Sequence, residues 1–375
     1  MKVLHVYRTY FPDPQGGLQE AIRQICLSTR AYGVVNTIFT LSPRPDPKII
    51  QREEATIVRS RSWAAPASCD LGGYAALRTF QRLASEADVI HYLFPWPFAD
   101  LLCLLSRHKA PAVMTYISDV VRQRWLGRAY APLMRNTLNR MEVIVSNAPG
   151  YAKTSPVLSS EAFARKIRYI PLGINESSYP SIADATVLDR LGLISTLPYF
   201  LFVGVLRYYK GLNFLLDAAA SVPVKIVIAG SGPESELLRE RARQKNLQNV
   251  IFAGQVTDAE KVSLIQNCLG LILPSHLRSE AYGMVLVEAA MFGKPMITCE
   301  IGTGTSYVNA HEVTGLVVAP GNPDQLANAM RFFLDNPERT FAFGQGARVR
   351  YESLFSGDAM GQAYGQLFRE VAGHE

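Results

Sequence analysis

Residues 279–294 read SEAYGMVLVEAAMFGK and predict a loop that runs into a helix. The helix is expected to begin near Gly283 or Met284 and to end at Gly293, because glycine followed closely by proline, here Pro295, terminates helices. The first N–H groups of a helix have no partner within it and carry the positive end of its dipole. The start of this helix is therefore a candidate site for a diphosphate.

Two glutamates flank the predicted start of this helix. Glu280 precedes it and Glu288 lies inside it, so at about 1.5 Å of rise per residue one carboxylate lies near each side of a bound phosphate. A nucleotide sugar has that layout, with hexose, pyrophosphate and ribose in line. The same stretch also fits a core helix that carries one solvated glutamate, and the stretch alone leaves both interpretations open.

Length and composition favour an ordered enzyme of two domains. The 375 residues exceed one comfortable hydrophobic core, and 48% hydrophobic against 19% charged residues argues against disorder. Five cysteines without a CxxC pair indicate neither a disulfide framework nor a zinc cluster, which favours the cytoplasm. The first residues lack the features of a signal peptide, and the most apolar run, 89–106, contains Asp100 and two prolines, so no membrane span is expected.

The charge is unevenly distributed along the chain. Residues 1–180 hold 22 Lys and Arg against 13 Asp and Glu, a net charge of +9, and the remainder holds 16 against 19, a net charge of −3. A basic half suits an anionic membrane surface or an anionic acceptor, and a scattered solvated surface is an equally good interpretation. Nucleic acid is not an expected partner, because no compact basic block or basic-aromatic motif occurs.

The first half of the chain alternates strands with helices. A strand at 3–7 leads into a loop that ends in Gly16 and Gly17, and a helix follows at 18–31. Glycines here let the backbone approach a bulky ligand closely. Gly16 and Gly17 lack the GxGxxG spacing of a dinucleotide-binding site, which argues against a Rossmann dehydrogenase. Further strands are expected at 35–41, 56–58, 89–93, 112–116 and 143–146, and helices at 74–84, 98–107 and 120–134.

Strands that alternate with helices predict a parallel sheet whose ligands bind beyond the carboxyl ends of its strands. By that rule Gly16, Gly17, His91 and the turn at 116–119 are candidate pocket residues. A single histidine such as His91 is more often a structural hydrogen-bonding residue than a catalyst. The motif IPLGIN at 170–175 closes this half, and the polar tract to residue 185 is the expected linker.

A second alternation predicts another doubly wound sheet. The motif RYYKG at 207–211 brings two cations, Arg207 and Lys210, to the carboxyl end of its first strand. Gly230 and Gly232 follow its second strand and open a helix. If these cations and the accessible backbone N–H groups at the glycines line one crevice with Gly283, they would form an anion site. Ordinary surface cations and tight turns would also account for these residues. The strands are expected at 199–205, 224–229, 250–252, 270–273, 295–298 and 315–318.

The two alternations set the expected domain boundaries. The first domain spans 1–175 and the second 186–355. The final amphipathic stretch, 358–371, is long enough to return to the first domain, so 356–375 is assigned there.

Together these motifs resemble the family 4 retaining glycosyltransferases of the GT-B fold, in which two Rossmann-like domains face a cleft that holds the donor. The resemblance covers nearly the whole chain. Its strongest part is Glu280-x7-Glu288 within PSHLRSEAYGMVLVEAAMFGKP. The supporting motifs are Gly16-Gly17, IPLGIN, RYYKG, IAGSGPE at 228–234, TGTSYVN at 303–309 and TGLVV at 314–318.

The resemblance implies a role for each matched residue. Glu280 would face the donor hexose, and Glu288 would bind ribose hydroxyls at about 1.5–3 kcal/mol for each charged hydrogen bond. The backbone N–H groups of Gly283, Met284 and Val285 would bind the sugar or diphosphate.

Other matched residues complete the implied donor site. Lys210 would neutralise the diphosphate, Gly230 and Gly232 would line the nucleotide-binding domain, and Gly16 and Gly17 would approach from the acceptor-side domain. No metal cofactor is implied, and no Asp-x-Asp occurs in the chain.

Two positions depart from the commonest pattern of the family. Ile117 stands where a histidine often follows Thr-Tyr, and Val205 stands where an arginine often follows the strand-ending glycine. The first departure removes a polar contact to the donor. Arg207 is expected to compensate for the second, because alternation places residues 205 and 207 on the same side of an extended chain.

The resemblance implies a cytoplasmic, membrane-peripheral enzyme that transfers a hexose from a nucleoside diphosphate sugar to a glycan or polyprenyl-linked glycan, with retention of configuration. The motifs TGTSYVN and SDVVRQ at 118–123 are most similar to members that use GDP-mannose or GDP-deoxyhexoses, such as GDP-rhamnose, in surface polysaccharide and O-antigen assembly. Two alternatives stay open. One is a GT-B nucleotide-sugar epimerase, and the other is a non-catalytic sugar-nucleotide-binding protein, which Ile117 and Val205 would suit.

Overall fold

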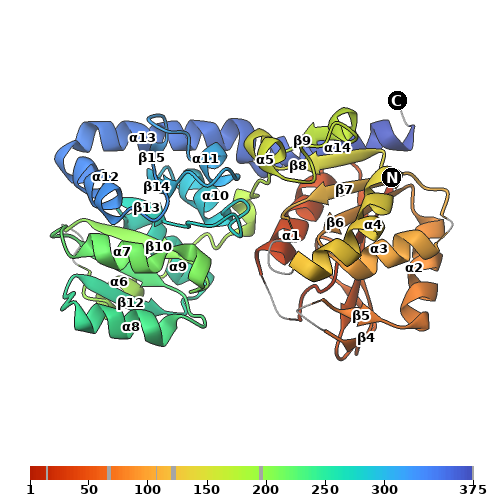
Figure 1. Ribbon diagram of the computed structural model, residues 1–375, viewed down its shortest axis with the longest axis horizontal. Helices are drawn as coiled ribbons and strands as arrows, with labels where there is room; N and C mark the ends of the chain where they lie inside the picture. Colours follow the sequence, from red (N-terminus) through yellow and green to blue (C-terminus); the bar gives the residue numbers. More distant parts are fainter. Residues whose placement is uncertain (14–15, 66–68, 107, 120–123, 194–196, 374–375) are drawn as a thin grey trace. The chain divides into compact units, whose positions relative to one another are not determined.

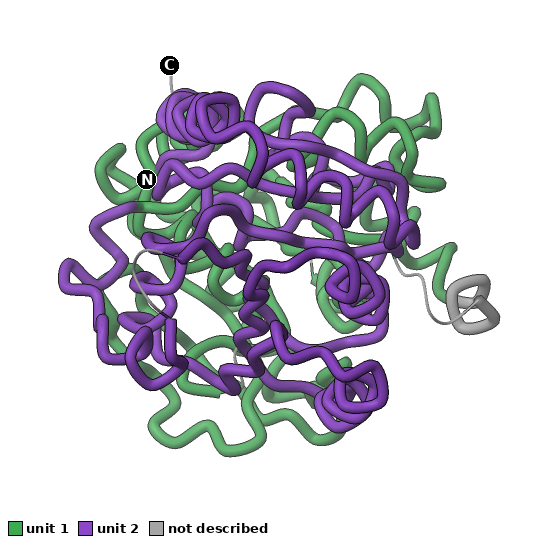
Figure 2. Tube along the Cα trace, turned by 90° about the vertical axis from the view of Figure 1, so that its left-hand side faces the viewer, with its two compact units in different colours: residues 1–175, 357–375 green, residues 176–356 purple. Residues whose placement is uncertain are grey.

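A computed structural model of the chain describes residues 1–13, 16–65, 69–106, 108–119, 124–193 and 197–373. The chain divides into two units, coloured separately in Figure 2. Unit 1 contains Met1–Asn175 and Gly357–Glu375, and unit 2 contains Glu176–Ser356.

Unit 1 is built on a nine-stranded sheet with the order β3-β4-β2-β1-β6-β7-β8-β9, in which β5 also pairs with β4 (Figure 1). All pairs are parallel except those of β3 and β5 with β4, which are antiparallel. The strands are β1 Lys2–Val6, β2 Val35–Ser42, β3 Ile49–Gln51, β4 Thr56–Ala64, β5 Leu71–Gly72, β6 Val89–Phe94, β7 Ala112–Tyr116, β8 Val143–Ser146 and β9 Ile167–Tyr169.

The helices of unit 1 include the C-terminal one. They are α1 Gly17–Arg30, α2 Tyr74–Glu86, α3 Pro97–Leu105, α4 Arg124–Arg140, α5 Pro149–Thr154 and α14 Gly357–Ala372. Helix α14 packs closely on α1. A side chain at Gly361 would prevent this contact, because its Cβ would lie 2.4 Å from the carbonyl oxygen of Ser28.

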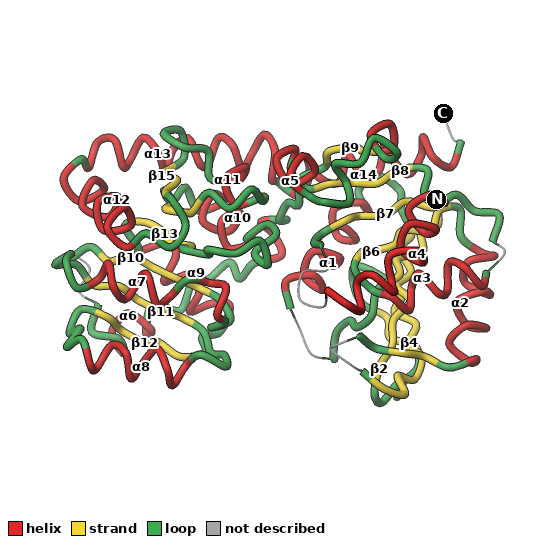
Figure 3. Tube along the Cα trace, viewed as in Figure 1, coloured by secondary structure: helices red, strands yellow, loops and turns green. Residues whose placement is uncertain are grey.

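Unit 2 is built on a six-stranded parallel sheet with the order β12-β11-β10-β13-β14-β15 (Figure 3). The strands are β10 Tyr199–Val203, β11 Lys225–Ala229, β12 Val250–Gly254, β13 Gly270–Leu273, β14 Met296–Cys299 and β15 Gly315–Val318. The helices are α6 Thr186–Arg190, α7 Leu212–Ala219, α8 Ser235–Gln244, α9 Asp258–Asn267, α10 Met284–Met291, α11 Thr305–Val308, α12 Pro323–Asp335 and α13 Pro337–Arg350.

Both faces of this sheet are buried, as its apolar strands predict. In β10, Leu201 belongs to a core cluster that includes residues of α6 and α9. The next residue along the strand points the other way: the ring of Phe200 lies 6.1 Å from that of Phe333 in α12. Period-two alternation with apolar residues on both faces therefore places helices on both sides of the sheet.

The alternation of strands and helices predicted from the sequence is confirmed, and several element bounds differ from expectation. Strand β4 continues to Ala64 rather than ending at residue 58, and β10 ends at Val203 rather than at 205. Strands β3, β5 and β9 were not expected. Of the predicted helix at 120–134, residues 120–123 lie outside the described residues, as does residue 107 at the end of another predicted helix. None of the described helices is long and apolar enough to cross a membrane.

Candidate active site

Helix α10 begins where the sequence predicts. Gly283 caps its N-terminus with φ 84° and ψ 68°, a left-handed conformation that favours glycine. A Cβ at Gly283 would also lie 2.8 Å from a methyl group of Leu273. The N–H groups of Met284 and Val285 lie in the first turn, where no helical carbonyl precedes them, so they are suited to an anion.

Lys210 and Glu280 form an ion pair beside this helix. The Lys210 ammonium contacts Glu280 Oε2, and the two side chains are only 12% and 10% exposed. Ser275 Oγ donates to the same carboxylate oxygen at 3.2 Å. The pair is therefore shielded from water and held by a further hydrogen bond, unlike an exposed surface salt bridge.

The strand order explains why these residues meet. Lys210 ends the 3-10 helix Tyr208–Lys210 that follows β10, and Ser275 and Glu280 follow β13. Strands β10 and β13 are neighbours in the sheet, and between them the chain changes direction along it. The crevice beyond the carboxyl ends of strands at such a switch point is where open α/β sheets bind ligands.

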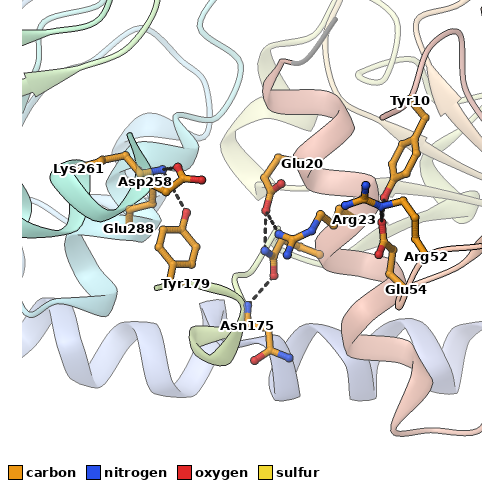
Figure 4. A network of polar contacts seen from close by, with 11 residues as sticks. Tyr10, Glu20, Arg23, Arg52, Glu54, Asn175, Tyr179, Asp258, Lys261 and Glu288 are labelled. Atoms are coloured by element: carbon orange, nitrogen blue, oxygen red, sulfur yellow. Dashed lines mark hydrogen bonds and ion pairs between the residues drawn. The ribbon is translucent and has the colours of Figure 1, made fainter. Parts of the chain in front are cut away.

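Glu288 is held by two donors from other segments of unit 2 (Figure 4). Its Oε1 accepts hydrogen bonds from Tyr179 Oη and, at 2.9 Å, from Lys261 Nζ. Lys261 also pairs with Asp258 at 3.2 Å. Burial acts to lower the pKa of Lys261, but the Glu288 and Asp258 carboxylates outweigh it and the pKa is raised.

The second oxygen of Glu288 differs from the first. Among the described residues, Oε2 receives no hydrogen bond from a protein donor, although the residue is only 8% exposed. A carboxylate fixed through one oxygen can accept ligand hydroxyls through the other.

The sequence did not reveal the partners of Glu288. Tyr179 lies in the tract that was expected to be a linker, and Lys261 is one of several charged residues on α9. Neither has a local pattern that marks it. The capping box of Thr257 and Glu260 fixes the start of α9, and this places Lys261 in the first turn of that helix.

Gly230 and Gly232 bring two loop backbones together. A Cβ at Gly230 would lie 2.0 Å from the carbonyl oxygen of Gly204, and one at Gly232 would lie 2.4 Å from that of Leu206. These contacts join the loops after β10 and β11. Close backbone packing thus accounts for both glycines, and their contact with a ligand stays a prediction.

Gly16 and Gly17 lie at the corresponding place in unit 1, where Gly16 caps the N-terminus of α1 and Gly17 is its first residue. Strands β1 and β6 flank the point at which this sheet changes direction. A Cβ at Gly17 would meet no described atom within 4 Å, so local packing does not require glycine there. The close approach of a ligand remains the proposed reason for it.

Among the described residues the Arg207 guanidinium is not part of the Lys210–Glu280 ion pair, although the Lys210 backbone N–H donates to the Arg207 carbonyl oxygen at 3.0 Å. It lines a groove of about 430 Å³ with Leu212 of α7, Arg241 of α8 and Glu234, the N-cap of α8, and the lining does not include Lys210 or Glu280. The alternation argument that joined Arg207 to Val205 depended on a strand reaching residue 205, and β10 ends at Val203. The role of Arg207 therefore stays a proposal with no support from the strand geometry.

His91 belongs to a buried chain of hydrogen bonds in unit 1. His5 Nε2 contacts Asn36 Oδ1 at 2.9 Å, the two Nδ1 atoms of His5 and His91 lie 3.0 Å apart, and His91 Nε2 contacts Thr115 Oγ1 at 2.7 Å. Thr115 Oγ1 lies 2.9 Å from the hydroxyl of Tyr364 in α14. The chain thus ties four strands, β2, β1, β6 and β7, to the C-terminal helix.

The donor directions along this chain can be assigned. The amide nitrogen of Asn36 donates to the carbonyl of Cys26, so its oxygen accepts from His5 Nε2. His5 Nδ1 then accepts from His91 Nδ1, and His91 Nε2 accepts from Thr115. Both rings are neutral in this arrangement. Burial lowers the pKa of His5 to about 4, and burial with the neighbouring His5 lowers that of His91.

The turn at 116–119 is also held internally. Asp119 accepts hydrogen bonds from Tyr116 at 3.0 Å, Tyr151 at 3.0 Å and Ser155 at 2.6 Å. Ile117 is buried in a core cluster with Tyr7 and other apolar residues. The departure at residue 117 therefore places an apolar side chain in the core.

Comparison with known proteins identifies the family. Residues 16–173 match the glycosyl transferase 4-like domain, and residues 187–350 match the glycosyl transferases group 1. The D-rhamnosyltransferase WbpZ of Pseudomonas aeruginosa is 42% identical over 359 residues, which cover 95% of this chain and 92% of that protein. The chain belongs to glycosyltransferase family 4.

Further comparisons agree with this membership. The O-antigen chain mannosyltransferase C of Escherichia coli is 38% identical to this glycosyltransferase over 368 residues, or 98% of each chain. A sucrose-phosphate synthase from Thermosynechococcus elongatus aligns over 100% of both chains with a TM-score of 0.78 and 22% identity. Anabaena HepE in complex with UDP aligns over 99% of this chain and 100% of that one, with a TM-score of 0.78 and 18% identity. The predicted GT-B fold is confirmed.

Proposed function

We propose that this glycosyltransferase is a hexosyltransferase that moves mannose or rhamnose from a GDP-linked donor to a glycan or polyprenyl-linked glycan, with retention of configuration, during O-antigen or related polysaccharide synthesis. The names of the two relatives reported above, at 42% and 38% identity over nearly the full length, support the choice of sugar. D-Rhamnose is 6-deoxymannose, so one hexose pocket suits both sugars. The basic first half of the chain supports action on an acceptor at the inner face of the plasma membrane.

The observation that carries the proposal is the Lys210–Glu280 pair beside the first turn of α10. A donor diphosphate is attracted both to Lys210 and to the N–H groups of Met284 and Val285. When the diphosphate binds the Lys210 ammonium group, Glu280 loses that partner and can accept a hydrogen bond from a hydroxyl of the hexose. The pair therefore holds both charges ready at the reacting centre before the donor arrives.

The proposed reaction breaks the bond between C1 of the hexose and the diphosphate oxygen, and it forms a bond from C1 to an acceptor hydroxyl. The hydroxyl proton leaves with the diphosphate. Negative charge develops on the leaving oxygen, where Lys210 stabilises it, while Glu288 holds the ribose. Contacts that strengthen in the transition state, from Lys210 to the leaving oxygen and from Glu280 to the hexose, accelerate the reaction, whereas the ribose contact contributes binding.

A donor screen tests the proposal. GDP-mannose and GDP-D-rhamnose should raise the melting temperature, because a ligand that binds only the native state stabilises it, and UDP-glucose should raise it less. With a mannose-terminated oligosaccharide, transfer should yield an α-linked product by NMR. Stabilisation without transfer would favour the sugar-nucleotide-binding protein, and formation of an epimerised donor would favour the epimerase.

A further inference from the structure

Strand β4 carries three large side chains on one face of unit 1. Its sequence from residue 59 is RSRSW, and residues two apart in a strand point to the same side. Arg59 is buried at 5% exposure, Arg61 is exposed, and Trp63 is 69% exposed. The three side chains therefore run from the core to the surface towards the carboxyl end of the strand.

These side chains line a pocket of about 570 Å³ that lies wholly within unit 1. The residues that follow β2, including Arg44, Asp46 and Lys48, form another wall, and the first turns of α2 complete it. Strands β2 and β4 are parallel neighbours, and the pocket lies beyond the carboxyl end of β2, along the second half of β4. Parallel sheets place their ligands at this edge.

Arg59 fixes the shape of this pocket. Its guanidinium donates to Asp13 Oδ2 at 3.2 Å, to Ser42 Oγ at 2.7 Å and to the carbonyl oxygen of Arg44 at 3.0 Å. It also donates to the carbonyl of Pro47 at 3.1 Å. Its Nε is buried and has no hydrogen-bond partner among the described residues. One buried cation thus organises the loop after β2.

The pocket has an excess of positive charge. No ion pair joins Arg44, Lys48 or Arg61 to a carboxylate of the described residues, and Asp46 is the single acidic residue in the lining. These three cations are exposed, so water and salt screen their mutual repulsion, and a bound anion would neutralise them directly. A neutral oligosaccharide would give no such compensation, whereas a diphosphate would.

The exposed aromatic side chain in the lining is that of Trp63. The Arg61 guanidinium lies 5.0 Å from the centre of its ring. Trp63 packs on Gly73, where a Cβ would lie 2.8 Å from the indole nitrogen. The ring therefore rests against backbone while remaining 69% exposed. Such a surface suits the apolar face of a sugar or the first units of a lipid chain.

We propose that this pocket binds the diphosphate that joins the acceptor glycan to its isoprenoid carrier, with the groups next to the diphosphate lying on Trp63. This assignment rests on the proposed function and names the chemistry of its acceptor. Arg61, Arg44 and Lys48 contact the diphosphate, and Arg59 is a positioning residue that holds the loop.

Binding can be measured without a sugar donor, so the result does not depend on the proposed transfer. Farnesyl diphosphate is the probe, farnesol is its uncharged match, and the signal is the Trp63 fluorescence that Trp63→Phe removes. Arg61→Ala should weaken farnesyl diphosphate binding about tenfold or more, because a charge-assisted contact is lost. Arg82→Ala is the control, because Arg82 lies on α2 outside the pocket and pairs with Glu86.

Three outcomes would overturn the assignment. The first is equal affinity of the parent protein and Arg61→Ala for farnesyl diphosphate. The second is that farnesol binds as tightly as farnesyl diphosphate, which would show that the surface binds the apolar chain and not the diphosphate. The third is that GDP binds more tightly than farnesyl diphosphate and that Arg61→Ala weakens the binding of both ligands equally. That result would identify the pocket as a nucleotide site. In transfer assays, Arg61→Ala should raise the KM for a diphosphate-linked acceptor about tenfold.

Discussion

The ammonium group of Lys210 contacts the carboxylate of Glu280 across 70 residues of sequence. The two lie in segments that follow adjacent strands, β10 and β13, and both side chains are largely buried. Breaking such a pair by removing one partner leaves a buried charge without compensation, which costs about 3–5 kcal/mol unless a ligand replaces the partner. A diphosphate is a suitable replacement for Glu280. We therefore interpret the pair as a contact that the donor exchanges rather than as a support of the fold.

The first prediction concerns Glu288. Glu288→Gln should raise the KM for the donor about tenfold or more and change kcat little, since the ribose contact is equal in the ground and transition states. Steady-state kinetics with GDP-mannose measures both constants. A fall in kcat with an unchanged KM would contradict the ribose assignment. Tyr179→Phe removes one donor to Glu288 and should show a smaller change in the same direction.

The second prediction is that transfer does not require a divalent metal. Lys210 and the first amides of α10 can compensate the diphosphate charge, and the chain lacks an Asp-x-Asp motif. Initial rates with and without a chelator should therefore agree. Full loss of activity in chelator, with recovery on addition of manganese, would contradict this.

The third prediction follows from the buried histidines. Because His5 and His91 have lowered pKa values in the folded state, unfolded chains bind more protons as the pH falls from 6.5 towards about 4. Stability should decrease across that window, by up to about 1.4 kcal/mol per pH unit for each histidine. Urea unfolding at several pH values measures the slope.

A variant isolates the contribution of this pair. His91→Gln should flatten the dependence of the unfolding free energy on pH. Equal slopes for His91→Gln and the parent would show that other groups cause the acid sensitivity.

The fourth prediction concerns Arg207. If it supplies the charge that Val205 cannot, Arg207→Ala should lower turnover about tenfold, and arginine at position 205 in that variant should restore part of it. Lys210→Ala should have the larger effect, because Lys210 lies at the helix start with Glu280. Donor affinity and turnover of Arg207→Ala within twofold of the parent would assign Arg207 to its groove on α7 and α8 instead.

Features with a local cause were predictable. The strand period, the glycine that caps α10 and the positions of Glu280 and Glu288 follow from neighbouring residues, and the structure has them as expected. Strand β5, with two residues, is too short for a periodic signal. Strand β4 was expected to be short, because the polar run RSRSW does not resemble a buried strand.

Contacts between distant segments were not predictable in the same way. The sequence placed Lys210 and Glu280 near the same anion site, but it did not predict the ion pair between them. That pair depends on β10 and β13 being neighbours in the sheet. Tyr179 and Lys261 reach Glu288 from a loop and from another helix, and neither position carries a local signal. The placement of Arg207 was inferred from a strand expected to continue past residue 205, but β10 ends at Val203, four residues before Arg207.

The most direct test of the account is the turnover of Glu280→Gln with GDP-mannose, measured beside its affinity for GDP. The account predicts a turnover about 10² to 10³ times lower, because a preorganised contact to the hexose is lost. It also predicts GDP binding at least as tight as in the parent, because Lys210 no longer has a carboxylate partner. Glu236→Gln, an exposed glutamate of α8, is the control and should behave as the parent. Parental turnover in Glu280→Gln, or a loss of GDP binding as large as the loss of turnover, would contradict the account.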